Sequence, residues 1–501
     1  MHLTLLECPA SRFALPPHLL SDSPATAAPV AAQETSAATA LHAPLYDRLA
    51  NHLPSMEERA QAATFLRTVL DEVAHDADEL PEDPQQLTAW MEANIANVHA
   101  QYQSYLESRK AGAPRRYFLN RAHALYFLRQ VAPTKLVDGS WLYGLCAHGS
   151  NARLSDLITT YVEELGDGQA DKNHVKLYRT LLARHGLDPV DDLEDPLYRQ
   201  GLVQLALGWN AEEFLPEVVG FNLGYEQLPL HLLITAYELN ELGIDPYYFT
   251  LHVTVDNADT GHAKRACVAA LEAAPRIDDG GEYWRRVRAG AKLGNTGLST
   301  LDVIHGFDID SEVITILARK ASSGHGAHSD FCKVAGRSVN DWLANADDVP
   351  AFLAALEQGG WIKRNQPAQD SRFWRLLQGD RAEMFGVFSP YELQVIHDWI
   401  RGPASVDGAP FDAGAALGGT ARQMSFRVAQ RLQAARRPRA DAGSAAVPSS
   451  AALDTDLEIF EQRYPTLSAT EQQAMLVQAM APALHWTPVG LLATRMFLNR
   501  G

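Results

Sequence analysis

The stretch Pro246–Leu271, PYYFTLHVTVDNADTGHAKRACVAAL, decides how the rest of the chain is interpreted. Asp245 and the proline after it form a good helix start, because a carboxylate caps free backbone N–H groups and proline suits the first helical position. Apolar residues then recur at steps of three and four, which predicts a single helix with a core-facing stripe. The middle of this stripe is polar, at His252, Asp256 and Asp259.

Burying an imidazole and carboxylates on a core-facing stripe is strongly unfavourable unless another group pairs with them. A divalent metal ion is the strongest such partner. An isolated His-x3-Asp pattern is more often a hydrogen-bonded pair one turn apart. The prediction of a metal site therefore depends on matching ligands elsewhere in the chain.

The period of the apolar residues is helical from residue 44 to residue 275, with no sustained strand-like alternation and no βαβ spacing. The sequence therefore predicts an all-α bundle over 44–275. Around it we expect a mobile leader at 1–43, rich in Ala, Pro, Ser and Thr, and a second helical region at 276–434. A linker at 435–452 and a short helical tail at 453–501 complete the predicted organisation.

Composition excludes several classes of function. A net charge of −18 with no basic footprint argues against a nucleic-acid or anionic-membrane partner. The four cysteines are scattered without a CxxC pair, which favours a reducing compartment over a disulfide scaffold or a zinc ribbon. No apolar run reaches the length of a membrane span, and no signal peptide is recognisable, so we expect a soluble cytoplasmic protein. Motifs of metalloproteases, serine hydrolases and nucleotide-binding enzymes are missing from the sequence.

Two further segments supply acidic and imidazole groups. A predicted helix over 151–165 places Glu164 toward the core and turns Glu163 toward solvent, and His174 opens the next helix. Glu226 ends a later predicted helix. A glutamate from one helix end and a histidine from the next can meet inside a bundle.

The candidate ligands come from different helices and share oxygen and nitrogen donors. They are Glu164, His174, Glu226, His252 and Asp256, completed by Asp259 or His262. A set of this kind without thiolate suits non-haem iron or manganese. Four-helix bundles build dimetal carboxylate sites from inward glutamates and histidines on facing helices.

The order Glu, His, Glu and then His-x3-Asp on one helix, with EELGDG before the first histidine, resembles the iron-containing redox enzyme family. The resemblance covers roughly 130–275 and implies a haem-oxygenase-like helical bundle. It also implies two iron ions per chain held by the candidate ligands, O2 as co-substrate, and no catalytic residues beyond these ligands. Family members oxidise small organic molecules such as amines, amino acids or fatty acids, often in natural-product biosynthesis.

The sequence departs from the family pattern at the last ligand, which in the family is a histidine three residues after the aspartate. This chain has Asp259 there and His262 one turn later. On an ideal helix Asp259 lies about 20° from His252 and His262 about 80° from it. Either Asp259 replaces the histidine, or a π-bulge brings His262 into the metal site. We prefer His262, because imidazole is the family's ligand at this position.

An altered site would instead suit a haem-oxygenase-like binding or assembly protein that performs no oxidation. A single-metal hydrolase is a third reading. The expected partner is a small-molecule substrate. For residues 276–501, homodimer formation, a lid and a second binding site are equally open roles.

Overall fold

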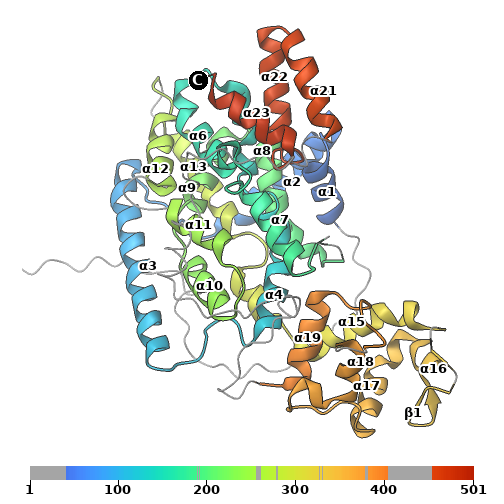
Figure 1. The fold of residues 1–501 in the computed structure, drawn as a ribbon. Coiled ribbons are helices and arrows are strands. Elements are labelled where there is room, and N and C mark those ends of the chain that lie inside the picture. The colour runs from blue at the N-terminus through green and yellow to red at the C-terminus, as the bar shows by residue number, and fades with distance from the viewer. Residues whose placement is uncertain are drawn as a thin grey trace, which may run out of the picture.

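The computed structural model describes residues 41–188, 190, 192–255, 261–277, 280–326, 328–329, 331–378, 382–403 and 454–500. Within these residues the structure is helical, and its one sheet is the antiparallel pair β1 (Lys333–Val334) and β2 (Arg337–Ser338). The predicted all-α class is therefore confirmed (Figure 1). The predicted leader and linker lie almost wholly outside the described residues.

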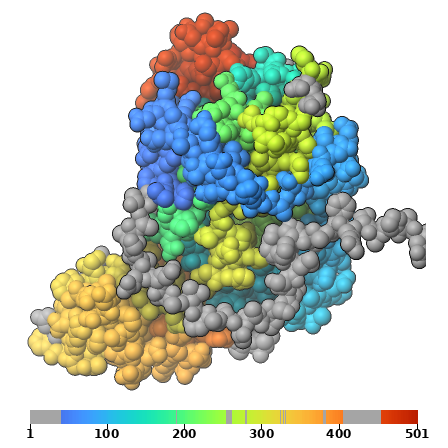
Figure 2. Space-filling view, turned by 180° about the vertical axis from the view of Figure 1, so that it is seen from behind, coloured from blue at the N-terminus to red at the C-terminus, as the bar shows by residue number. Residues whose placement is uncertain are grey.

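One hydrophobic core joins the N-terminal helices, half of the central bundle and the C-terminal helices. Its helices are α1 (Ala43–Asn51), α2 (Met56–Glu72), α3 (Leu87–Lys110), α6 (Ser155–Glu164), α8 (Arg199–Trp209), α9 (Leu215–Tyr225), α12 (His262–Glu272), α13 (Gly281–Lys292), α21 (Thr455–Arg463), α22 (Ala469–Ala479) and α23 (Pro488–Leu498). The 3-10 segment η4 (Ser140–His148) also belongs to this core. Figure 2 shows the N-terminal helices covering the bundle, with the C-terminal helices at one end.

A second core joins the other half of the bundle to a separate lobe. Its bundle helices are α4 (Arg121–Gln130), α7 (His174–Arg184), α10 (Leu230–Glu241) and α11 (Tyr247–Val255), with the short α5 (Ala132–Lys135) beside them. The lobe contains α14 (Thr300–His305), α15 (Ile309–Gly324), α16 (Val339–Leu343), α17 (Val349–Gln358), α18 (Arg372–Leu377) and α19 (Pro390–Arg401). It lies at the lower right of Figure 1, beyond α4 and α10.

Short 3-10 turns connect these helices. They are η2 (Val73–His75), η3 (Pro84–Gln86), η5 (Ala152–Leu154), η6 (Gly166–Gly168), η7 (Asp195–Tyr198), η8 (Leu293–Asn295), η9 (Ala346–Asp348), η10 (Ala368–Asp370) and η13 (Tyr464–Thr466). No helix among the described residues combines the length and the apolar character needed to span a membrane. The two cores contribute α6, α9 and α12 on one side and α7 and α11 on the other, and these five helices surround the candidate site.

Candidate metal centre

Four buried side chains from four segments converge at the junction of the two cores. Asp138, Glu164, His174 and His252 each offer one ligand atom, and these atoms all lie within 4.8 Å of one another. We call them the four-residue group. Each of these residues is between 2% and 9% exposed, so water does not compensate for the burial of their polar groups.

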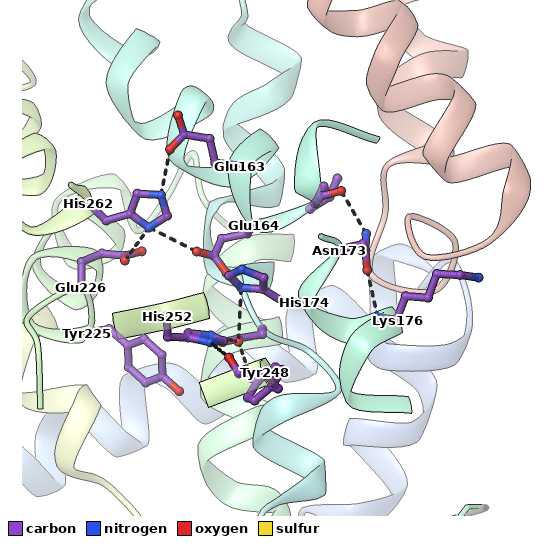
Figure 3. Close-up of polar contacts among 12 residues, drawn as sticks. Glu163, Glu164, Asn173, His174, Lys176, Tyr225, Glu226, Tyr248, His252 and His262 are labelled. Atoms are coloured by element: carbon purple, nitrogen blue, oxygen red, sulfur yellow. Dashed lines mark hydrogen bonds and ion pairs between the residues drawn. The ribbon is translucent and has the colours of Figure 1, made fainter. Parts of the chain in front are cut away.

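Glu164 links the helices of the four-residue group. Nδ1 of His174 forms an ion pair with Oε2 of Glu164 and lies 3.8 Å from Oδ2 of Asp138. Asn173 caps α7 by accepting a hydrogen bond from the backbone N–H of Lys176 at 3.0 Å, so the helix begins with His174 directed inward (Figure 3).

His252 is oriented by its own helix. Its Nδ1 lies 2.7 Å from the backbone oxygen of Tyr248, which fixes the ring proton on Nδ1. Burial, followed by the charge of His174, lowers the pKa of His252, so the ring is neutral. Its unprotonated Nε2 then faces Oδ2 of Asp138 at 2.9 Å.

Asp138 is ionised in this arrangement. Burial alone would raise the pKa of its carboxyl, but the positive charge of Lys135 is the largest of the effects that oppose burial and lower the pKa. The Tyr248 hydroxyl donates a hydrogen bond to Oδ2 at 2.6 Å. A neutral imidazole nitrogen and a carboxylate oxygen that face each other at 2.9 Å repel unless a cation lies between them, which is the situation that a metal ion resolves.

A second cluster shares Glu164 with the first. Glu164, Glu226 and His262 also offer ligand atoms within 4.8 Å of one another, and we call them the three-residue group. Nδ1 of His262 lies 3.1 Å from Oε2 of Glu226 and 3.3 Å from Oε1 of Glu164. Glu226 follows the end of α9 and His262 begins α12, so two helix ends meet at the shared carboxylate (Figure 3).

The other nitrogen of His262 points toward the outside of the bundle. Its Nε2 lies 2.8 Å from Oε2 of Glu163, and Arg265 holds the same oxygen at 2.5 Å. Burial opposes the ionised form of Glu163, but the hydrogen bonds from His262 and Arg265 lower its pKa. A carboxylate that binds the far nitrogen of a histidine is the usual outer partner of a metal ligand. The prediction that Glu163 faces solvent is therefore wrong, since its side chain is only 34% exposed and contacts His262.

One ligand atom of the site lacks a hydrogen-bonding partner. Oε1 of Glu226 is fully buried and makes no hydrogen bond within the described part of the chain. A buried polar atom without a partner is rare and is normally satisfied by a bound water molecule or ion. Together with the oxygen- and nitrogen-rich donor set, it fits a metal ion such as iron.

The charges of the site are strongly coupled. Burial would raise the pKa of Glu164, but His174 and His262 hold it well below its usual range. Burial would lower the pKa of both histidines, but Glu226 raises that of His262 and Glu164 raises that of His174. Burial raises the pKa of Glu226, and His262 only partly offsets this effect. Both histidines therefore hold a proton more tightly than a free imidazole does, and a metal ion would take the place of these protons.

The structure brings most of the predicted ligands together but not on the helix that the sequence predicted. Glu164, His174, Glu226, His252 and His262 lie together, whereas Asp256 and Asp259 lie outside the described residues. The prediction of one continuous helix from residue 246 to residue 271 is wrong. Gly261 has an extended backbone and precedes a new helix, so the direction of His262 does not follow the period of α11.

Asp138 was missed by the sequence analysis. It lies in a turn between α5 and η4, where no helical stripe exists to mark an inward position. The available signal was the Asp-Gly pair in VDGSW. Gly139 adopts φ +79°, and a Cβ there would lie 2.8 Å from Cβ of Glu164, so the turn and the ligand helix approach each other only because residue 139 is glycine.

Residues 125–295 match the model of a family described as iron-containing redox enzyme. This stretch contains both groups of candidate ligands, and the resemblance predicted from the sequence is confirmed. None of the curated proteins and none of the solved structures matches the chain. The family description supports an oxidoreductase, and the buried carboxylate and histidine cluster can hold metal.

Proposed function

We propose that this chain, whose residues 125–295 match the model of the iron-containing redox enzyme family, is a non-haem diiron oxidase or oxygenase. One iron ion would be held by the four-residue group and the other by the three-residue group. When bound, the iron supplies the binding and reduction of O2 that oxidises a small organic substrate. The chain itself supplies fixed ligands, a buried site and control over protons.

The observation that carries this proposal is the position of Glu164 between the two groups. Its Oε2 pairs with His174, while its Oε1 lies 3.3 Å from Nδ1 of His262. A carboxylate whose two oxygens face two different donor sets is arranged as a bridge between two cations. A haem site would need a single axial histidine and would leave Asp138, Glu164 and Glu226 buried without a role.

The proteins of this family act on amines, amino acids or fatty-acid-like molecules, and Lys135 favours a substrate with an anionic group. Its ammonium lies 5.7 Å from the centre of the Tyr225 ring, and no carboxylate of the described residues pairs with it directly. Burial disfavours its charge, but Tyr225 and Asp138 raise its pKa, so it stays protonated. Within the described residues, two ferrous ions would exceed the charge of Asp138, Glu164 and Glu226, and Lys135 adds to that excess. An amino acid or fatty acid would balance it.

The test of the diiron proposal is anaerobic loading with Fe(II), followed by a count of iron per chain and optical spectra as O2 is admitted. We expect about two ions, as in other carboxylate-bridged bundles, and a transient visible band. Glu226→Ala and His252→Ala should each lose the band. Glu212→Ala, which changes a carboxylate that is 79% exposed, is the matched control and should keep it.

Two results would count against the proposal. A chain that binds iron but neither forms a band nor consumes O2 would indicate a binding or assembly protein. A chain that binds one ion and hydrolyses a substrate without O2 would indicate a single-metal hydrolase.

The role of Lys135 can be tested before a natural substrate is known. Octanoate and octylamine serve as probes, and the visible spectrum of the Co(II)-loaded protein serves as readout. We expect octanoate alone to perturb the spectrum, Lys135→Met to abolish this effect and Lys135→Arg to retain it. An equal response to octylamine would contradict an anionic substrate.

A further inference from the structure

The C-terminal helices return from a distant part of the sequence to the segment that carries Glu164 and His174. The chain between residues 403 and 454 lies outside the described residues, yet α22 packs against η4, and α23 packs against η6, the turn that follows α6 (Figure 1). Among the described residues from 300 onward, only those of the C-terminal tail, 454–500, contribute to the core that contains α6. The tail is therefore placed to influence two candidate ligands.

The first contacts hold the end of α6 and the turn after it. The Tyr161 hydroxyl donates a hydrogen bond to the backbone oxygen of Met480 at 2.5 Å, one helical turn before Glu164. Arg495 donates from Nη1 to the backbone oxygen of Gly168 at 2.5 Å. Gly168 has φ +73°, and a Cβ there would lie 2.4 Å from the backbone oxygen of Leu491, so the turn lies directly against α23.

The second set of contacts holds the start of α7. Asn173 is completely buried, and its side-chain NH2 lies 3.2 Å from Nδ1 of His485 and 3.4 Å from the His485 backbone oxygen. The same NH2 group donates to the backbone oxygen of Leu165 at 3.2 Å. The Asn173 side-chain oxygen caps α7 at the N–H of Lys176 (Figure 3). One amide therefore connects the tail, the end of α6 and the helix that begins with His174.

His485 is suited to accept the hydrogen bond from Asn173. It is 2% exposed, and burial, with smaller contributions from Arg179 and His174, lowers its pKa to about 3. The ring is therefore neutral at physiological pH, with a free lone pair on the nitrogen that faces the amide. Its neighbour Trp486 is covered by the Arg179 guanidinium at 4.2 Å, which attaches this part of the tail to α7 a second time.

We propose that the C-terminal helices are a positioning element of the metal centre, in which His485 acts through Asn173 to set the place of His174. The inference rests on the proposed diiron function, because it assigns a role at that site. A tail that only stabilised the fold would affect both ions, whereas the proposed positioning role affects one of them. Changes at His485 should affect the ion of the four-residue group and leave the ion of the three-residue group in place.

The experiment measures the affinity of both ions in the full-length chain by chelator competition with Co(II), and their visible spectra. His485→Leu removes the hydrogen-bond acceptor of Asn173. It should lower the affinity for the ion of the four-residue group about 10-fold, which is the lower end of the effect of a residue that orients a metal ligand, and should change the spectrum of that ion. His485→Gln can accept the same hydrogen bond and should restore affinity and spectrum. Leu498→Ala is the matched control, since it changes a side chain of α23 that is 44% exposed and that takes no part in these contacts.

A second variant covers the case in which His485→Leu fails to fold. Arg495→Met removes the hydrogen bond to Gly168 at the surface of the tail and should weaken the same ion by a smaller factor. Equal loss of both ions, or unchanged affinity in all variants with two ions bound by the wild type, would overturn the positioning role and leave the diiron proposal standing. A wild type that binds no metal would overturn both.

Discussion

The four-residue group and the three-residue group share Glu164 but are supported in different ways. The four-residue group draws on the turn before η4, α6, α7 and α11, and its outer partners, Tyr248 and Asn173, are themselves buried. The three-residue group depends on two helix ends, and its outer support is the pair of Glu163 and Arg265, with side chains 34% and 21% exposed.

This difference indicates unequal binding strength. A ligand set fixed by several packed elements loses little freedom when a metal binds, whereas one supported by a solvated pair must be ordered further. We therefore expect the four-residue group to fill first and the three-residue group to hold its ion more weakly. The following predictions test that order.

The largest effect is expected for Glu164→Ala, because this change removes the one ligand of the described residues that both groups share. We expect iron binding to fall from about two ions per chain to none at micromolar iron, as for loss of a bridging carboxylate in a dimetal bundle. Metal analysis after gel filtration measures this, and circular dichroism verifies that the helices persist. Retention of either ion at wild-type affinity would show that the groups are independent.

Single-group variants should each remove one ion. Asp138→Ala takes a ligand from the four-residue group alone, and His262→Ala takes one from the three-residue group alone. We expect one ion per chain in both cases, with tighter binding in His262→Ala because the better supported group remains. Calorimetric titration with Co(II) compares them. Tighter binding in Asp138→Ala would reverse the proposed order.

Metal affinity should depend on pH, because each group is expected to release one proton when it binds its ion. The raised pKa values of His174 and His262 mean that both rings keep their protons to a higher pH than a free imidazole does, and a metal ion must displace these protons. Affinity should therefore rise with pH, with up to about two protons released per chain. Titrations in buffers of different ionisation enthalpy count them. His262→Ala should release about one, and a pH-independent affinity would contradict the assignment.

The smallest effects are expected for the outer partners. Glu163→Gln removes the carboxylate behind His262, and Tyr248→Phe removes the hydroxyl that donates to Asp138. Each change should lower the metal affinity of the group that it supports about 10-fold, which is the lower end of the effect of such partners. Chelator competition resolves the two ions. An equal effect of Glu163→Gln on both groups would indicate that the carboxylate acts on the charge of the whole site.

The sequence was informative where helical period and residue chemistry coincide. The stripe of α6 identified Glu164, and the helix start after the Gly-rich turn identified His174. It failed where the backbone leaves the helix. Asp138 lies in a turn, and the extended backbone at Gly261 makes the angle calculated for His262 irrelevant. The contact of the tail with Asn173 joins residues 312 positions apart, which no local pattern encodes.

By itself, the sequence determined that the protein is all-α, that it resembles iron-containing redox enzymes, and that glutamates and histidines of separate helices are the candidate ligands. These properties follow from local periodicity and donor chemistry, which are readable residue by residue. Only the tertiary structure decided that Asp138 joins them, that Glu164 lies between two groups, and that Glu163 supports His262. These relations depend on how distant segments pack, and packing is set by the whole core.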